Sequence, residues 1–293
     1  MRKAVVLPAV SVAGGIFGLA VRQFQLNTAF EPGTGLPIAG QPATYAMWAV
    51  VAVTVLAIVG LCMGKHRTFE KCYTSAFRTT SMVQLSGAMA GAVLLLAAGF
   101  FNVEAFVSAP VDPFTRIRSV SIVRPILGVV CLAAAAGVWF TVQKMKGGQQ
   151  VKSVWVLLPG LVGCLWVMAN YQSWAQDPVI EQYVFSLLAV MLSMVGCYFL
   201  AGFAFGKGQV KGALIACLLG ASFCIVALGD GLPMYDVALY VAMIFYLLSM
   251  ASTLLTNDAK PEPPEGLPSC GGSCQGCPGC GPVPEPENDN ESK

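Results

Sequence analysis

The sequence predicts an all-α integral membrane protein of about eight transmembrane helices, followed by a disordered tail rich in Cys, Pro and Gly. Hydrophobic residues make up 56% of the 293 residues and charged residues only 11%, whereas a soluble domain has about 25% charged residues. A soluble fold has too little polar surface to cover so much apolar surface. Together with a net charge of only +2, this composition excludes a soluble enzyme, a nucleic-acid binder and a wholly disordered protein.

Eight stretches of the chain contain about the 20 mostly apolar residues that a membrane helix needs. None alternates between apolar and polar residues with regular turns, so helices are predicted rather than a β-barrel. The stretches define a polytopic domain, residues 1–256, and a tail, residues 257–293. In order, the predicted spans are Ala4–Val21, Tyr45–Met63, Met82–Phe101, Ile122–Val142, Val154–Tyr171, Tyr183–Phe205, Val210–Leu228 and Tyr235–Thr256.

Lys and Arg are unevenly distributed between the two sides that these spans define. Thirteen lie at the N-terminus, in the even-numbered connections and in the tail, whereas four, Arg22, Arg116, Arg118 and Arg124, lie on the opposite side. Because positively charged connections stay in the cytoplasm, both termini are predicted to be cytoplasmic and the chain to be a multi-pass protein of the cell membrane. The third connection, around which three of the four arginines lie, is the exception.

Two features of the spans have alternative interpretations. The first span follows Arg2 and Lys3 and contains a small-residue motif at 18–20, as a cleaved signal peptide does, but its apolar run is longer than usual. Spans one and five each contain a Leu-Pro pair, at Pro8 and Pro159, and each is the first of four. This pattern predicts two parallel four-helix repeats, with chance as the alternative.

Two G-x-x-x-G pairs, Gly14 with Gly18 and Gly87 with Gly91, lie within the predicted spans. Such pairs let helix backbones approach closely. They predict tight packing within the bundle, or between two copies of the chain in a homodimer.

Charged residues are absent from the predicted span centres. Arg22 falls in the first outer connection, Arg124 at the entrance of the fourth span, and Asp236 at the edge of an outer loop. Asp230 lies between two glycines, where a turn-forming role is expected. Because ion-coupled pumps use buried carboxylates, this distribution argues against that class but not against a carrier of neutral solutes. The residues predicted to line a cavity for such a solute are Gln84, Ser86, Asn170 and Ser222.

The chain has one histidine, His66, in a basic connection outside the spans. A haem held between membrane helices by two histidines is therefore excluded. A subunit that handles a quinone without haem remains compatible with the sequence.

The tail contains four cysteines within eleven residues, Cys270, Cys274, Cys277 and Cys280, separated by small residues. Thiolates at this density can surround one soft ion, and the intervening glycines permit tight turns. The first interpretation is a site for Zn(II) or Cu(I). An iron–sulfur cluster, thiol chemistry and no specific role are the alternatives.

These observations predict passage of a small solute or ion across the membrane, with a tail that binds a soft metal. The alternative is a non-catalytic membrane anchor or quinone-site subunit of a redox complex. An enzyme is not favoured, because no His/Asp/Glu group shares one depth in the membrane. The expected partners are the lipid bilayer, a second copy of the chain, or a cytoplasmic protein bound through the tail.

Overall fold

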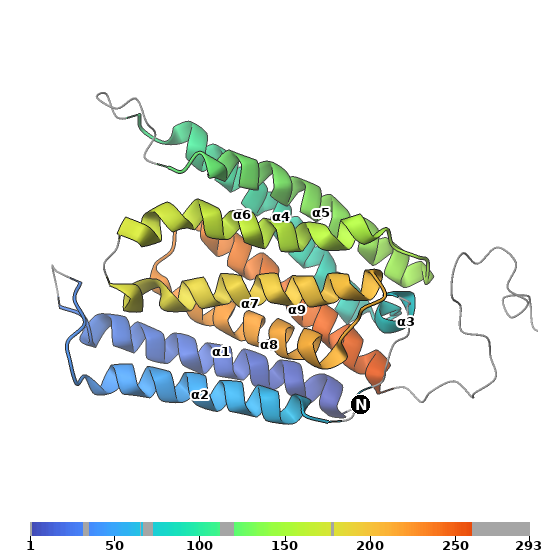
Figure 1. The fold of residues 1–293 in the computed structure, drawn as a ribbon, viewed down its shortest axis with the longest axis horizontal. Helices are drawn as coiled ribbons and strands as arrows, with labels where there is room; N and C mark the ends of the chain where they lie inside the picture. Colours follow the sequence, from blue (N-terminus) through green and yellow to red (C-terminus); the bar gives the residue numbers. More distant parts are fainter. Residues whose placement is uncertain are drawn as a thin grey trace, which may run out of the picture. The chain divides into compact units, whose positions relative to one another are not determined.

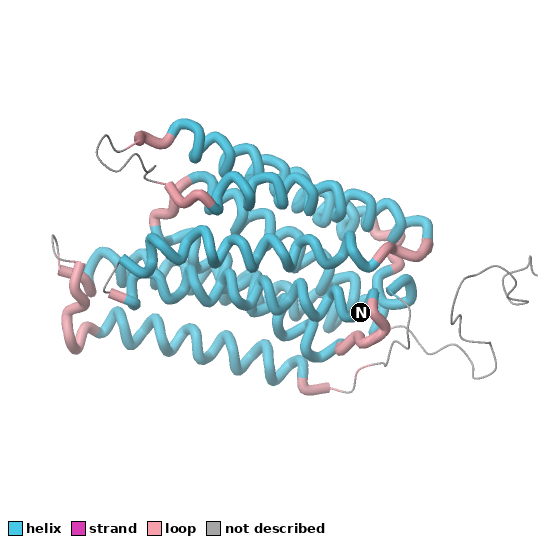
Figure 2. The backbone as a smooth tube through the Cα atoms, turned by 45° about the horizontal axis from the view of Figure 1, so that its top comes forward, coloured by secondary structure: helices cyan, strands magenta, loops and turns pink. Residues whose placement is uncertain are grey.

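The computed structural model describes residues 2–31, 35–64, 66, 73–111, 120–176 and 179–259. The described residues are almost entirely helical (Figures 1 and 2). The cysteine cluster predicted to bind a metal lies outside them. The elements are α1 (Arg2–Thr28), α2 (Pro42–Cys62), α3 (Tyr73–Phe77), α4 (Met82–Ser108), α5 (Val123–Gly147), α6 (Ser153–Gln176), α7 (Ile180–Ala204), α8 (Val210–Ala227), the 3₁₀ turn η1 (Leu228–Asp230) and α9 (Met234–Asp258).

Eight of the described helices are long and apolar enough to cross a membrane, and each corresponds to one predicted span. The prediction of a polytopic, all-helical membrane protein is therefore confirmed. Several helices extend beyond the predicted spans. The largest differences are in α1, which continues seven residues past Val21, and in α4, which continues to Ser108. These extra turns hold polar residues that are buried against neighbouring helices, which a boundary drawn on hydropathy alone omits.

Helices α8 and α9 form the centre of the bundle. Most of α8 is enclosed by protein, and most of α9 is too, whereas α2 is largely exposed on the lipid-facing side. The pair α1–α2 packs against α8, and the pair α4–α5 packs against α9 and α6. Helix α7 lies between α6 and α8 (Figure 1). The core is a continuous apolar cluster with many Ala, Gly and Cys residues, which let the central helices approach closely.

Helix neighbours cross the boundary between the two predicted four-helix repeats. The first four spans do not form a bundle of their own, because α1–α2 and α4–α5 each pack mainly on helices of the second half. Residues up to Ala259 form one compact unit. Pro8 and Pro159 are each the seventh residue of their helix, so the two halves correspond at this position. The packing of the helices shows no such correspondence between the halves.

Both G-x-x-x-G pairs are used in packing within the chain. A Cβ atom on Gly14 would lie 2.7 Å from Thr54 of α2, and one on Gly18 would lie 2.7 Å from Val226 of α8. Gly87 and Gly91 both face α9, where a Cβ on Gly87 would meet the Ser249 hydroxyl at 2.3 Å. The interpretation as internal packing is confirmed for these glycines, and a homodimer remains a prediction that they do not support.

Candidate functional site: a buried polar belt

The two ends of the bundle carry different groups of charges. One end, called the terminal end below, holds the start of α1, the α5–α6 and α7–α8 turns and the end of α9 (Figure 1). The opposite end, called the belt end, holds the α8–α9 turn and two buried ion pairs. Because buried charge within membrane helices is costly, these pairs are the first candidates for a functional site.

The first ion pair joins α1 to the η1 turn. Arg22 Nε donates to Asp230 Oδ1 at 2.7 Å, and the Arg22 side chain is fully buried. Its other two nitrogens donate to Gln25 Oε1 at 2.9 Å and to the Gln182 carbonyl at 2.6 Å. The guanidinium also lies 4.9 Å from the centre of the Phe185 ring. Each guanidinium nitrogen thus has a partner, as a buried arginine requires.

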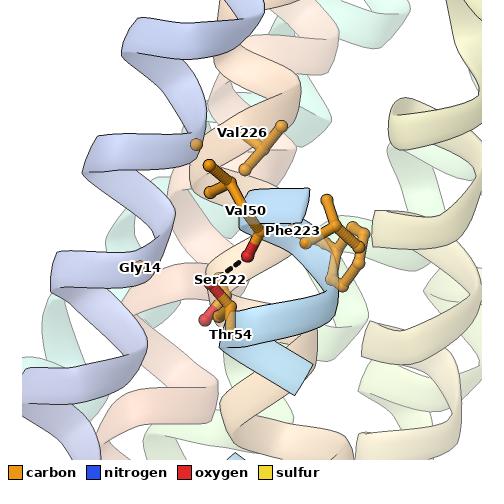
Figure 3. A pocket seen from close by; sticks show the side chains of 8 residues that line it. Gly14, Val50, Thr54, Ser222, Phe223 and Val226 are labelled. Carbon is orange, nitrogen blue, oxygen red and sulfur yellow. Dashed lines mark hydrogen bonds between the residues drawn. The ribbon is translucent and has the colours of Figure 1, made fainter. Parts of the chain in front are cut away.

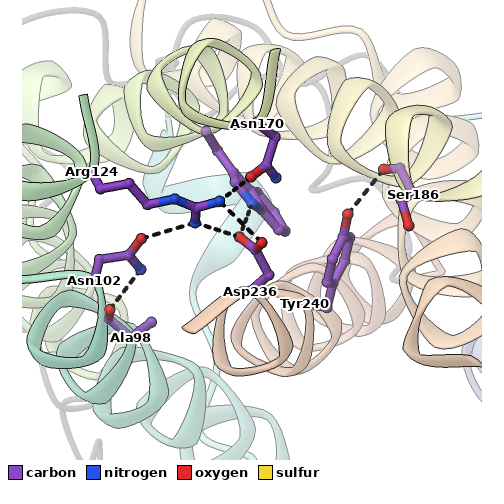
Figure 4. Close-up of polar contacts among 8 residues, drawn as sticks. Ala98, Asn102, Arg124, Asn170, Ser186, Asp236 and Tyr240 are labelled. Carbon is purple, nitrogen blue, oxygen red and sulfur yellow. Dashed lines mark hydrogen bonds and ion pairs between the residues drawn. The ribbon is translucent and has the colours of Figure 1, made fainter. Parts of the chain in front are cut away.

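The second ion pair joins α5 to the first turn of α9 (Figure 4). Arg124 donates two hydrogen bonds to Asp236, from Nη1 to Oδ1 at 2.9 Å and from Nη2 to Oδ2 at 3.3 Å. The same nitrogens donate to Asn102 of α4 and Asn170 of α6. The Tyr235 ring lies 4.1 Å from the guanidinium, in cation–π contact. This two-pronged geometry is the strong form of an arginine–carboxylate pair.

Three side chains connect the two ion pairs. Trp166 Nε1 donates to Asp236 Oδ1 at 2.9 Å, and the Trp166 and Tyr240 ring centres are 4.4 Å apart. The Tyr240 hydroxyl donates to the Ser186 carbonyl at 3.0 Å, and the Ser186 hydroxyl donates to Asp230 Oδ2 at 2.5 Å. A continuous set of contacts therefore crosses the bundle, and we call it the polar belt. Its members are Arg22, Asn102, Arg124, Trp166, Asn170, Ser186, Asp230, Asp236 and Tyr240.

Both carboxylates of the belt come from one short segment, residues 230–236, while the arginines come from α1 and α5 on opposite sides of it. The α8–α9 turn is thus held from both sides. Removing one partner of a buried ion pair costs about 3–5 kcal/mol, because it leaves an uncompensated charge. The belt consequently fixes the lateral helix pairs against the central helices.

Sequence reasoning missed the belt because it placed Arg22 and Asp230 in connections, and Arg124 and Asp236 at the edges of spans, with no reason to pair them. Arg22 is not in the first outer connection but inside α1, which continues to Thr28. Asp230 lies in a turn as expected, but its carboxylate is buried in an ion pair rather than exposed. The sequence did contain a sign of the belt. The predicted outer side, which should have few basic residues, holds Arg22 and Arg124 together with acidic residues that could pair with them.

The residues predicted to line a solute cavity lie in separate places. Asn170 is part of the polar belt. Gln84, near the terminal end, bonds to Thr256 at 2.9 Å, while the exposed Ser86 donates to the Val83 carbonyl. Ser222 lies midway along α8, where its hydroxyl is 3.0 Å from that of Ser11. The structure does not bring these four side chains together, and each hydroxyl or amide is hydrogen-bonded to another group of the chain.

Two hollows lie along α1 and α2. The inner one has a volume of about 10 Å³, room for about one water molecule, between Gly14, Thr54 and Ser222 (Figure 3). The outer one is a groove of about 450 Å³ between α1 and α2, lined by aliphatic and aromatic side chains and by Thr54. The Thr54 hydroxyl donates to the Val50 carbonyl at 2.8 Å. The groove therefore offers an apolar wall rather than a polar binding site.

His66 joins the ends of two spans at the terminal end. Its Nδ1 lies 2.7 Å from Asp258 Oδ2, and its Nε2 lies 2.9 Å from the Cys62 carbonyl. Elsewhere in the part of the chain that the structure describes, no three His, Cys, Asp or Glu side chains are grouped so as to hold a metal. Five described cysteines are buried in the core, namely Cys62, Cys131, Cys197, Cys217 and Cys224.

Comparison of the chain with protein-family models, with curated proteins and with solved structures finds no match.

Proposed function

We propose that this chain is a non-catalytic membrane anchor, a rigid helical platform that holds a partner protein at the membrane. The observation that carries this proposal is the filled interior of the bundle. The central helix α8 is packed against α7, α9 and α1, and the polar side chains between these helices bond to one another. This packing favours the anchor over passage of a solute, which needs a path between the helices.

The polar belt supports the same proposal. It joins six long helices and the η1 turn. The contacts of Arg22 and Arg124 would have to break if the lateral helix pairs moved away from the central helices. A bundle held in this way suits a scaffold better than a carrier that alternates between two states. In its more specific form, this proposal makes the partner a redox enzyme, with a quinone bound between the enzyme and the anchor.

We further propose that the terminal end faces the cytoplasm. Its described turns and helix ends carry Lys146, Lys152, Lys207 and Lys211, all exposed. The tail cysteines would then lie in a reducing compartment, where thiols remain available to a soft metal ion.

The buried native cysteines provide the test. In native membranes, Cys197, Cys217 and Cys224 should not react with a small, water-soluble thiol reagent until the protein is denatured, as measured by mass spectrometry of peptides. A Gln149→Cys variant, at an exposed position in the α5–α6 turn, is the matched control, and it should react quickly, but only when the reagent reaches the cytoplasmic side. Core cysteines that react in the folded protein at a rate near that of the control would show water entering the core. That result would favour solute passage.

A further inference from the structure

An exposed aromatic side chain and two exposed lysines lie on the α7–α8 turn and the start of α8, at the terminal end. Phe205, which caps α7, is 57% exposed. Lys207 follows it in the same turn, and Lys211 lies in the first turn of α8. All three side chains are exposed, and Phe205 is thus an apolar side chain in contact with solvent at the end of α7. An apolar centre with a charged rim is the usual anatomy of a protein interface.

Neighbouring turns extend this surface. The Ser153 hydroxyl donates to the Ala204 carbonyl at 3.0 Å, which places the start of α6, and with it the exposed Lys152, beside the end of α7. Helix α3 is joined to the same place by the Phe77 and Phe203 rings, whose centres are 5.3 Å apart. We call this surface the basic platform; its members are Arg78, Lys146, Lys152, Phe205, Lys207 and Lys211.

The position of the platform distinguishes it from a site for lipid headgroups. Lipids surround the perimeter of a bundle, whereas Lys207 and Lys211 flank the start of α8, the helix that the protein encloses most fully. A molecule that covers this place must lie across the end of the bundle. Among the described residues of the terminal end, Asp258 is the acidic one, and its carboxylate contacts His66. The described residues of the platform therefore carry an excess of positive charge.

We propose that the basic platform docks an acidic surface of a water-soluble protein, with Phe205 inserted into an apolar pocket of that partner. This proposal rests on the proposed anchor function and names the chemistry of the anchored partner. Complementary charges guide such encounters and fix the register, while the buried aromatic group supplies most of the affinity.

The test uses the full-length chain in the membranes of its own host. A photo-crosslinking amino acid is placed at Phe205, and, as a matched control, at Phe17, which is 61% exposed on the lipid-facing wall of α1. Position 205 should give one discrete protein adduct, and position 17 should give lipid adducts. Reversing three charges, by Lys152→Glu, Lys207→Glu and Lys211→Glu together, should lower the protein adduct about tenfold, and added salt should lower it too.

A charge swap decides the outcome. Once the adduct partner and its crosslinked acidic residues are identified by mass spectrometry, changing those residues to Lys should restore the adduct with the charge-reversed chain. An adduct that the reversal leaves unchanged, or a swap that does not restore it, overturns the proposal. Lipid adducts alone at position 205 overturn it in favour of anionic headgroups. If the core thiols prove reactive while the swap succeeds, the anchor proposal fails and the docking surface stands.

Discussion

The belt end and the terminal end of this bundle treat charge in opposite ways. At the belt end, Arg22 and Arg124 are buried, and each is matched by one carboxylate and by neutral hydrogen-bond partners. At the terminal end, lysines are exposed on turns, and His66 Nδ1 lies 2.7 Å from Asp258 Oδ2. The comparison shows that a membrane bundle can use basic residues for two purposes. Buried arginines fix how helices pack, and exposed basic residues remain available for orientation and contact.

The largest expected effect comes from breaking the belt at its most connected member. Arg124→Ala should lower the free energy of unfolding by about 3–5 kcal/mol, because it leaves Asp236 buried without its counter-charge. Unfolding of the purified protein in mixed micelles, followed by tryptophan fluorescence, measures the loss. Lys146→Ala at the terminal end is the matched control and should change stability by less than about 0.5 kcal/mol.

A paired substitution sharpens this prediction. Arg124→Met combined with Asp236→Leu removes both charges and keeps apolar volume, so it should recover most of the lost stability. If the double variant is as unstable as the single one, the cost lies in lost packing with Asn102, Asn170 and Trp166 rather than in an unpaired charge.

A smaller effect is expected where the two halves of the belt meet. Tyr240→Phe removes the hydrogen bond to the Ser186 carbonyl but keeps the ring contact with Trp166. The expected loss is about 1 kcal/mol, the usual value for one buried hydrogen bond. Tyr198→Phe, at a tyrosine that is 68% exposed, serves as the control and should have no measurable effect. Equal losses in the two variants would mean that Tyr240 does not link the ion pairs.

The smallest expected effect is at the terminal end. His66→Ala removes two part-buried hydrogen bonds between the end of α2 and the end of α9, and the loss should be about 0.5–1 kcal/mol, at the low end of the range for hydrogen bonds. Hydrogen exchange should reveal it locally, as faster exchange in the last turn of α9, with the belt end unchanged. A global change as large as that of Arg124→Ala would contradict the contrast between the two ends.

The tail provides a separate prediction. The full-length chain, purified under reducing conditions, should carry about one equivalent of Zn(II) or Cu(I) more than a variant with Ser at positions 270, 274, 277 and 280. Because thiolates must lose their protons to bind, the retained metal should decrease as the pH falls. Equal metal content in the two proteins would leave the tail as a spacer.

Hydropathy predicted the existence and order of all eight spans, because each helix must satisfy its own backbone in lipid. The belt was harder to predict for two physical reasons. Gly18, Arg22 and Gln25 follow one another at helical spacing and lie on one buried face of α1, so the face continues after the apolar run ends. The pairing of Arg22 with Asp230 also depends on the packing of α1 beside α8, which composition does not determine.

The order of synthesis gives the α8–α9 turn a further consequence. Arg22 is made 208 residues before Asp230, and Arg124 is made 112 residues before Asp236. At 5–20 residues per second, Arg22 waits roughly 10–40 s for its counter-charge to leave the ribosome. During that time both arginines are exposed to lipid or to the insertion machinery without their partners. The belt is therefore completed by the last hairpin, and a chain truncated before Asp230 would keep Arg22 and Arg124 without their carboxylates.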